Sequence, residues 1–292
     1  MSKRRKAPRP ARPDRPKRAR DIFVPRPFEG LTDEPEWIAL REFVPAATAP
    51  LTLRPELVAE HGEQVVTLAT LLPLAAPAMR RADGEILIGL QRQISSGDPN
   101  RDVAAAILAA LATDEPGEVS VPHPPGEGPR LADVIVEGPL EITLHAGFDF
   151  WLQGEADDPA VAASLERANQ SIFPTVRMTA ARGAYWCQVP QRAHIRWVLP
   201  EPEDTALTAL ARLGAAGELK LGPDTKFAGM FRTSGRLVPV WDLPHQAPAD
   251  QWEEPLAAFA KRYAEALTVE GDLDPAVRRA RQGLIGRQLT LR

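Results

Sequence analysis

The sequence predicts an α+β fold in which antiparallel sheets carry helices on one face. The first observation behind this prediction is that short strand-like runs come in pairs, separated by turn signals such as Ala82–Gly84 and Thr233–Gly235. The second is that helical stretches follow the pairs, and hairpins followed by helices favour antiparallel pairing. At 292 residues, the chain is long enough for one large domain or two smaller ones.

Recurring Asp-Pro pairs mark the starts of three predicted helices. Asp caps the free amides of a first helical turn, and Pro fits the first helical position. The pairs are Asp98-Pro99, Asp158-Pro159 and Asp274-Pro275. After the first of them, apolar residues recur at helical spacing. Further helices are expected at Glu36–Phe43 behind an N-cap at Asp33, from Pro202 to Gly214, and near residues 252–267.

The predicted strands are runs rich in β-branched and aromatic residues. They are Val65–Leu71, Glu85–Gln91, Leu131–Val136, Leu140–Leu144, Phe148–Leu152, Ala184–Val189, His194–Leu199, Phe227–Arg232 and Leu237–Leu243. A faint repeat relates them, because Arg130–Ile135 aligns with Lys226–Phe231, and a Gly turn, a second strand and a helix follow each. Either the chain holds two similar β-β-α-β-β-α halves, or the periodicity is a coincidence.

Charge and periodicity together divide the chain into four predicted segments. They are a disordered Arg/Lys/Pro-rich arm at 1–24, an N-terminal α+β half at 25–170, a C-terminal α+β half at 171–268, and an Arg-rich C-terminal helix at 269–292. Disorder is expected in the arm because it has too little apolar surface to offset the entropy of ordering.

The arm is the strongest physical signal in the sequence. Residues 1–20 carry a net charge of +9, and since the whole chain carries −4, residues 21–292 carry −13. A flexible cationic segment can neutralise phosphates without base specificity, so RNA, the ribosome or DNA are candidate partners. The alternatives are an acidic protein or membrane surface, or a solvated tail. The candidate phosphate-binding residues are Lys3, Arg4, Arg5, Lys6, Arg9, Arg12, Arg15, Lys17, Arg18 and Arg20.

Several classes of protein are disfavoured by composition. Cys187 is the single cysteine, so an intrachain disulfide is impossible and a reducing, cytoplasmic location is favoured. The longest uncharged stretch, Val65–Met79, is shorter than a membrane span and contains two prolines. The five histidines lack the spacing of metal ligands. We therefore expect no cofactor, no metal and no membrane span.

A few residues invite a chemical interpretation. Cys187 is expected to be a buried strand thiol, but it would be a nucleophile if His194, on the adjacent predicted strand, acted as its base. The Ser95–Asp98 segment before a helix is expected to be a loop with an N-cap, with anion binding on free amides as the alternative. Trp151 is expected to be buried, or else exposed for stacking on a base or a partner.

Five segments of the chain resemble an uncharacterised family of actinobacterial cytoplasmic proteins, a domain of unknown function. These segments are Arg26–Leu31, Trp37–Arg41, Val44–Ala49, Asp98–Asp102 and Arg287–Arg292. The resemblance spans nearly the whole chain, and it implies a high-GC source and a basic front end without an established activity. At the level of fold, the paired β-β-α plan also resembles small secretion-chaperone folds.

Together these observations favour a non-enzymatic binding or adaptor protein. The arm would attach to nucleic acid or the ribosome, and the acidic body would contact a protein partner. One alternative is an enzyme whose site converges from distant residues. Another is a chaperone-like factor in protein handling or secretion. No residue of the body stands out as catalytic from the sequence.

Overall fold

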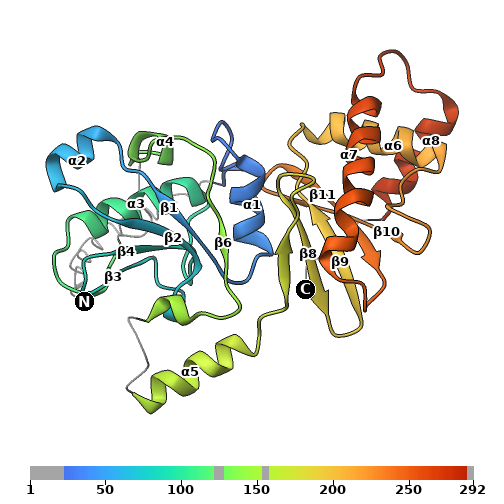
Figure 1. Cartoon of the computed structure of the whole chain (residues 1–292). Helices are drawn as coiled ribbons and strands as arrows, with labels where there is room; N and C mark the ends of the chain where they lie inside the picture. Colours follow the sequence, from blue (N-terminus) through green and yellow to red (C-terminus); the bar gives the residue numbers. More distant parts are fainter. Residues whose placement is uncertain (1–22, 122–127, 153–157, 288–292) are drawn as a thin grey trace, which may run out of the picture.

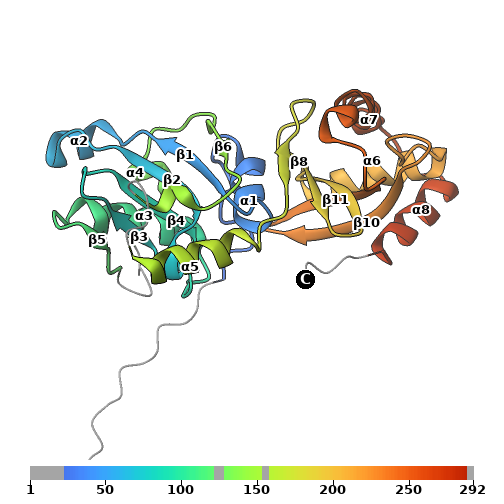
Figure 2. The ribbon, with the colours of Figure 1, turned by 60° about the horizontal axis from the view of Figure 1, so that its bottom comes forward.

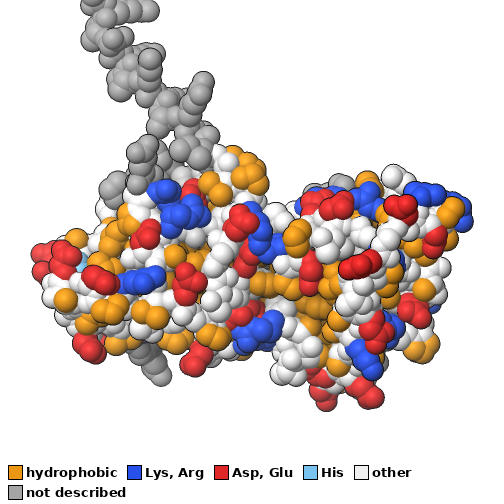
Figure 3. Space-filling model, turned by 90° about the horizontal axis from the view of Figure 1, so that it is seen from above, with side chains coloured by type: hydrophobic (Ala, Val, Ile, Leu, Met, Phe, Trp, Pro, Cys, Tyr) orange, Lys and Arg blue, Asp and Glu red, His pale blue; other side chains and the backbone are white. Residues whose placement is uncertain are grey.

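Two β-sheets lie side by side and form the framework of the molecule (Figure 1). The computed structural model describes residues 23–121, 128–152 and 158–287. The α+β class with antiparallel-rich sheets is confirmed. Seen from above, the described part of the molecule has two lobes, and hydrophobic side chains gather at the waist between them (Figure 3).

The first sheet has the strand order β5-β3-β4-β2-β1-β6. Its strands are β1 (Ala47–Leu51), β2 (Val66–Leu71), β3 (Ala78–Arg80), β4 (Ile86–Gln91), β5 (Gly117–Glu118) and β6 (Thr143–Leu144). Neighbouring strands are antiparallel except for β2 and β4, which are parallel. One face packs on α3 (Pro99–Leu111) and α4 (Leu131–Val134). The opposite face is covered by the short helix η2 (Asp149–Trp151).

The second sheet is antiparallel throughout, in the order β10-β11-β9-β8-β7. Its strands are β7 (Thr175–Arg177), β8 (Ala184–Val189), β9 (Arg192–Trp197), β10 (Lys226–Thr233) and β11 (Arg236–Leu243). Helices α6 (Glu203–Ala216) and α7 (Glu253–Leu267) cover one face, where the rings of Trp241 and Phe259 meet edge to face with their centroids 4.9 Å apart. The terminal helix α8 (Pro275–Ile285) packs beside α6 and buries Val277 and Leu284 (Figure 2).

Helix α1 (Glu34–Glu42) lies between the two sheets (Figure 1). Its apolar side chains Trp37, Ile38 and Leu40 are buried in the core of the first sheet. Its two buried carboxylates, Glu34 and Glu36, bind arginines of the second sheet. The helix therefore connects the sheets by apolar packing on one side and by ion pairs on the other. The remaining helices are α2 (Pro55–His61), α5 (Pro159–Asn169), η1 (Pro73–Ala75) and η3 (Ala249–Trp252).

The three Asp-Pro predictions are confirmed. Asp98, Asp158 and Asp274 each stand at the N-cap, and each side chain accepts a hydrogen bond from an amide of the first turn. Asp33 also stands at the start of its helix, but the predicted cap is absent: its backbone is left-handed, and its carboxylate accepts from the amide of Leu140 instead.

Two strand predictions in the first half are wrong. The run Leu131–Val136 begins with the single helical turn α4, because Leu131 and Val134 share one buried face and Asp133 accepts from the Arg130 amide. The run Phe148–Leu152 contains η2, in which Trp151 stacks on Phe148 and donates to the carbonyl of Leu71 at 2.5 Å.

These corrections remove the proposed internal repeat. The second half does follow β8-β9-α6-β10-β11-α7, preceded by β7. In the first half, the segment that aligned with β10 is helical, and β2 and β4 pair in parallel. The resemblance between the halves is therefore limited to the β-strand periodicity of the sequence.

Candidate functional site

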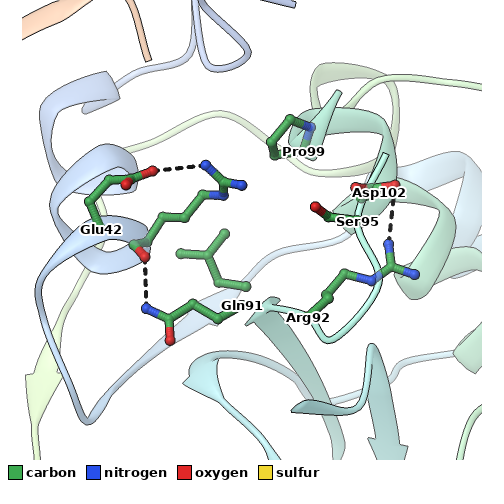
Figure 4. A pocket seen from close by; sticks show the side chains of 8 residues that line it. Glu42, Gln91, Arg92, Ser95, Pro99 and Asp102 are labelled. Atoms are coloured by element: carbon green, nitrogen blue, oxygen red, sulfur yellow. Dashed lines mark hydrogen bonds and ion pairs between the residues drawn. The ribbon is translucent and has the colours of Figure 1, made fainter. Parts of the chain in front are cut away.

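A polar pocket lies between the end of α1 and the loop that joins β4 to α3 (Figure 4). Its volume is about 180 Å³. It is lined by Arg41, Glu42, Leu90, Gln91, Arg92, Ser95, Pro99 and Asp102. None of these residues was singled out as a functional side chain from the sequence, apart from Ser95 as part of the loop before α3.

The loop on one side of the pocket is fixed by the start of α3. The Asp98 cap and Pro99 begin the helix, and in its first turn Asp102 accepts from the Ser96 amide at 2.9 Å. The Ser96 hydroxyl in turn accepts from the Asp98 amide at 3.1 Å. Because these amides already have partners within the chain, the interpretation of Ser95–Asp98 as a loop with an N-cap is confirmed.

Arg92 and Asp102 form a buried ion pair on the same side of the pocket (Figure 4). Their side chains are 5% and 2% exposed, and Arg92 Nη1 lies 3.3 Å from Asp102 Oδ1. The two groups are not aligned for a hydrogen bond, so Nε and Nη1 of Arg92 and Oδ1 of Asp102 have no hydrogen-bond partner. Burial lowers the pKa of Arg92, and the neighbouring Asp102 charge opposes that change.

The opposite side of the pocket belongs to α1 and the end of β4. Arg41 Nη1 contacts Glu42 Oε1 at 2.8 Å, and Gln91 Nε2 donates to the Arg41 carbonyl at 2.7 Å (Figure 4). Two arginines and two carboxylates leave the lining with no net formal charge. The pocket therefore suits a ligand that presents both a hydrogen-bond acceptor and a donor, rather than a simple anion.

The ten basic residues predicted to bind phosphates, Lys3 to Arg20, lie outside the described residues. The described chain begins beside the pocket, where the Val24 amide donates to the Gly97 carbonyl at 2.7 Å. Arg130 strengthens this attachment, since it donates to the Pro27 carbonyl at 2.8 Å and pairs with Asp98 at 3.0 Å. Val24 and Pro27, which follow the cationic segment in the sequence, are thus held near the loop that carries Ser95.

Cys187 is buried in β8, as predicted, and burial raises the pKa of its thiol. His194 is its direct neighbour on β9, and Asp242 on β11 is the direct neighbour of His194. Asp242 was missed, since nothing in its sequence neighbourhood signals the pairing of β11 with β9. Among the described residues, no group of His, Cys, Asp and Glu side chains is arranged to hold a metal ion.

A family model described as a family of unknown function, DUF5926, matches residues 27–292. The chain belongs to this family. No curated protein and no solved structure matches the chain. In the part of the chain that the structure describes, no helix is long and apolar enough to span a membrane.

Proposed function

We propose that this protein binds nucleic acid and that residues 1–20 hold the phosphate backbone. The observation that carries the proposal is the charge of +9 in twenty residues, fused to a remainder of −13. Lysine and arginine that neutralise phosphates release condensed counterions, which supplies affinity without base specificity. Acidic and basic side chains are interspersed over the lobes drawn in Figure 3, so the segment is the stronger source of attraction.

The body then acts as the adaptor part of the molecule. The described chain is attached at Val24, whose amide donates to the Gly97 carbonyl on the loop before α3, and Ser95 of that loop lines the Arg92 pocket. This pocket is our candidate for contact with a polar group of a bound strand or of a protein partner. We place this function in the cytoplasm of a high-GC organism, because a single cysteine suits a reducing compartment and 29 of the 35 basic residues are arginine.

Binding of a fluorescent single-stranded RNA by the full-length protein tests the proposal. We expect micromolar affinity, and if about five phosphates are engaged, a log–log salt slope of roughly −3 to −4. A full-length variant with the ten basic residues of segment 1–20 replaced by Gln should lose most of this binding. A matched control replaces Arg278 and Arg279, two exposed arginines of α8, with Gln and should bind like the native protein.

Equal affinity of the native protein and the Gln-substituted variant would overturn the proposal. If only the variant with the two α8 arginines replaced lost RNA binding, the nucleic-acid interface would have to be assigned to the C-terminal helix instead of residues 1–20. Affinity purification with and without nuclease then separates partners held through nucleic acid from partners held by the body.

A further inference from the structure

Cys187, His194 and Asp242 form a row across three neighbouring strands of the second sheet. In the registers of β8, β9 and β11, Cys187 lies opposite His194, and His194 lies opposite Asp242. Side chains that lie directly opposite on antiparallel strands share one face, with Cβ atoms about 4.5–5.5 Å apart. His194 therefore stands between a thiol and a carboxylate.

At the carboxylate end of the row, Asp242 is in contact with His194. Asp242 Oδ1 lies 3.1 Å from His194 Nδ1, and Asp242 Oδ2 accepts from Arg192 Nη1 at 2.7 Å. The imidazole is not aligned for a full hydrogen bond, which is common before a substrate tightens a site. Asp242 lies on the Nδ1 side of the imidazole, which leaves Nε2 as the nitrogen that can accept a proton. Cys187 Sγ and His194 form no hydrogen bond in the structure, so their proximity is that of directly opposite strand residues.

The row is largely shielded from water. Cys187 is 6% exposed, and the side chains of His194 and Asp242 are 15% and 18% exposed. Burial lowers the pKa of His194, although Asp242 opposes this, and burial raises the pKa of Cys187. A neutral imidazole beside a neutral thiol is the resting state that general-base activation requires, because the imidazole must be free to accept the thiol proton.

An apolar pocket lies along β7, the strand that pairs with β8 at Cys187. Thr175 of β7 lies opposite Cys187 and lines this pocket, whose volume is about 320 Å³. Phe173 and Val176 in the lining remain 47% and 41% exposed, and Leu144, Ile172 and the imidazole of His145 also belong to it. Cys187, the only cysteine of the chain, is not part of this lining, so the pocket offers room for a short apolar chain one strand away from the thiol.

We propose that Cys187 and His194 form a thiol acyl-transfer site, with Asp242 as the positioning residue, for esters or thioesters of short apolar acyl groups. Cys187 Sγ attacks the acyl carbonyl carbon while His194 Nε2 takes the thiol proton. The bond to the leaving oxygen or sulfur then breaks, and the imidazolium returns that proton to the leaving group. The product is an S-acyl cysteine, which water or a second nucleophile cleaves. Asp242 stabilises the transient imidazolium.

The single cysteine makes the test direct. Full-length protein is mixed with p-nitrophenyl butyrate, and we expect a burst of p-nitrophenol together with a mass increase of one butyryl group, located on Cys187 by peptide mapping. His194→Gln should slow acylation by about 10²-fold or more. Asp242→Asn should lower the acylation rate constant while leaving the half-saturating ester concentration unchanged, which loss of packing alone does not do.

Two controls keep the test decisive. Cys187→Ser should abolish the thiol adduct, and His61→Gln, on α2 and remote from this row, should acylate like the native protein. The thermal midpoint of each variant shows that it is folded. Acylation of Cys187 only after denaturation, or at an unchanged rate in folded His194→Gln, would overturn the proposal. Neither outcome bears on binding of nucleic acid by residues 1–20.

Discussion

Glu36 and Asp102 are both carboxylates on helices, with side chains 0% and 2% exposed, and both face an arginine, yet their surroundings differ. Glu36 accepts from Arg177 at 2.7 Å, from the Tyr185 hydroxyl at 2.6 Å and from the Gly183 amide at 3.1 Å. Asp102 accepts from the Ser96 amide, but its pairing with Arg92 lacks hydrogen-bond alignment.

The difference separates a satisfied structural contact from an unsatisfied ion pair in the wall of a pocket. A buried ion pair repays the cost of desolvation only when its remaining polar atoms are satisfied. Around Glu36 they are, and the cluster fastens α1 to the second sheet. Around Asp102 they are not: three buried polar atoms of the Arg92–Asp102 pair lack a hydrogen-bond partner in the wall of the pocket. Hydrogen-bond satisfaction, rather than burial or charge, distinguishes the Glu36 carboxylate from that of Asp102. Arg236, which binds Glu34 in the same joint of α1 with the second sheet, keeps Nε and Nη1 without partners.

Removing the charge of Glu36 should have the largest effect. Glu36→Gln leaves Arg177 without its partner and turns one acceptor of the cluster into a donor, so we expect a loss of about 3–5 kcal/mol in the free energy of unfolding. Guanidinium chloride denaturation measures it. Glu141→Gln, at an exposed site, is the control and should stay within about 0.5 kcal/mol of the native protein. A loss below about 1 kcal/mol for Glu36→Gln would contradict the assignment of this cluster as a joint.

Glu34 should make the same joint sensitive to acid. Burial alone would raise its pKa, but hydrogen bonds from Arg26 and Arg236 outweigh it and lower the pKa. A lowered folded-state pKa stabilises the fold above the unfolded value of about 4.3 and loses that contribution as the pH falls further. Near neutral pH, Glu34→Gln should cost about 2 kcal/mol, the worth of hydrogen bonds to a charged group. The difference in the free energy of unfolding between the native protein and Glu34→Gln should shrink below about pH 4. If the free energies of unfolding of the two proteins differed by the same amount from pH 7 to pH 2.5, this mechanism would be contradicted.

Replacing both members of the Arg92–Asp102 pair should change the free energy of unfolding least. Arg92→Met alone leaves the Asp102 carboxylate buried beside an apolar side chain, and we expect a cost of about 1–3 kcal/mol. Adding Asp102→Asn removes that charge and keeps an acceptor for the Ser96 amide, so the double variant should lie within about 1 kcal/mol of the native protein. Urea denaturation of the native protein, both single variants and the double variant completes the cycle. A double variant as unstable as Glu36→Gln would show that the pocket pair is also a structural joint.

Much of the local structure followed from the sequence. The Asp-Pro pairs located three helix starts, and four of the five strands of the second sheet were found within one or two residues, because these signals act over a few neighbouring residues. The short edge strand β7 was not predicted. The turn α4 and the parallel pairing of β2 with β4 were not predicted, since both depend on burial against segments remote in the chain.

The candidate sites were harder to predict for the same reason. Arg92 directly follows the apolar β4, and only the fold brings the end of α1 and the first turn of α3 around it. The neighbourhood of Cys187 and His194 was predictable because a tight hairpin joins their strands. Asp242 reaches His194 through a pairing of β11 with β9 that spans α6 and β10, and no local pattern indicates it.

The hydrogen bond from Val24 to Gly97 also has a mechanical consequence. If residues 1–22 are held by a long polymer, tension along the chain enters the body at this bond and then at the contact of Arg130 with Pro27. Gly97 lies on the loop before α3, and Arg130, at the start of α4, is paired with Asp98 at the end of that loop, so tension would act on this loop, which also lines the Arg92 pocket. Under load, this loop would be the first part of the body to open, and its opening would change the shape of the pocket.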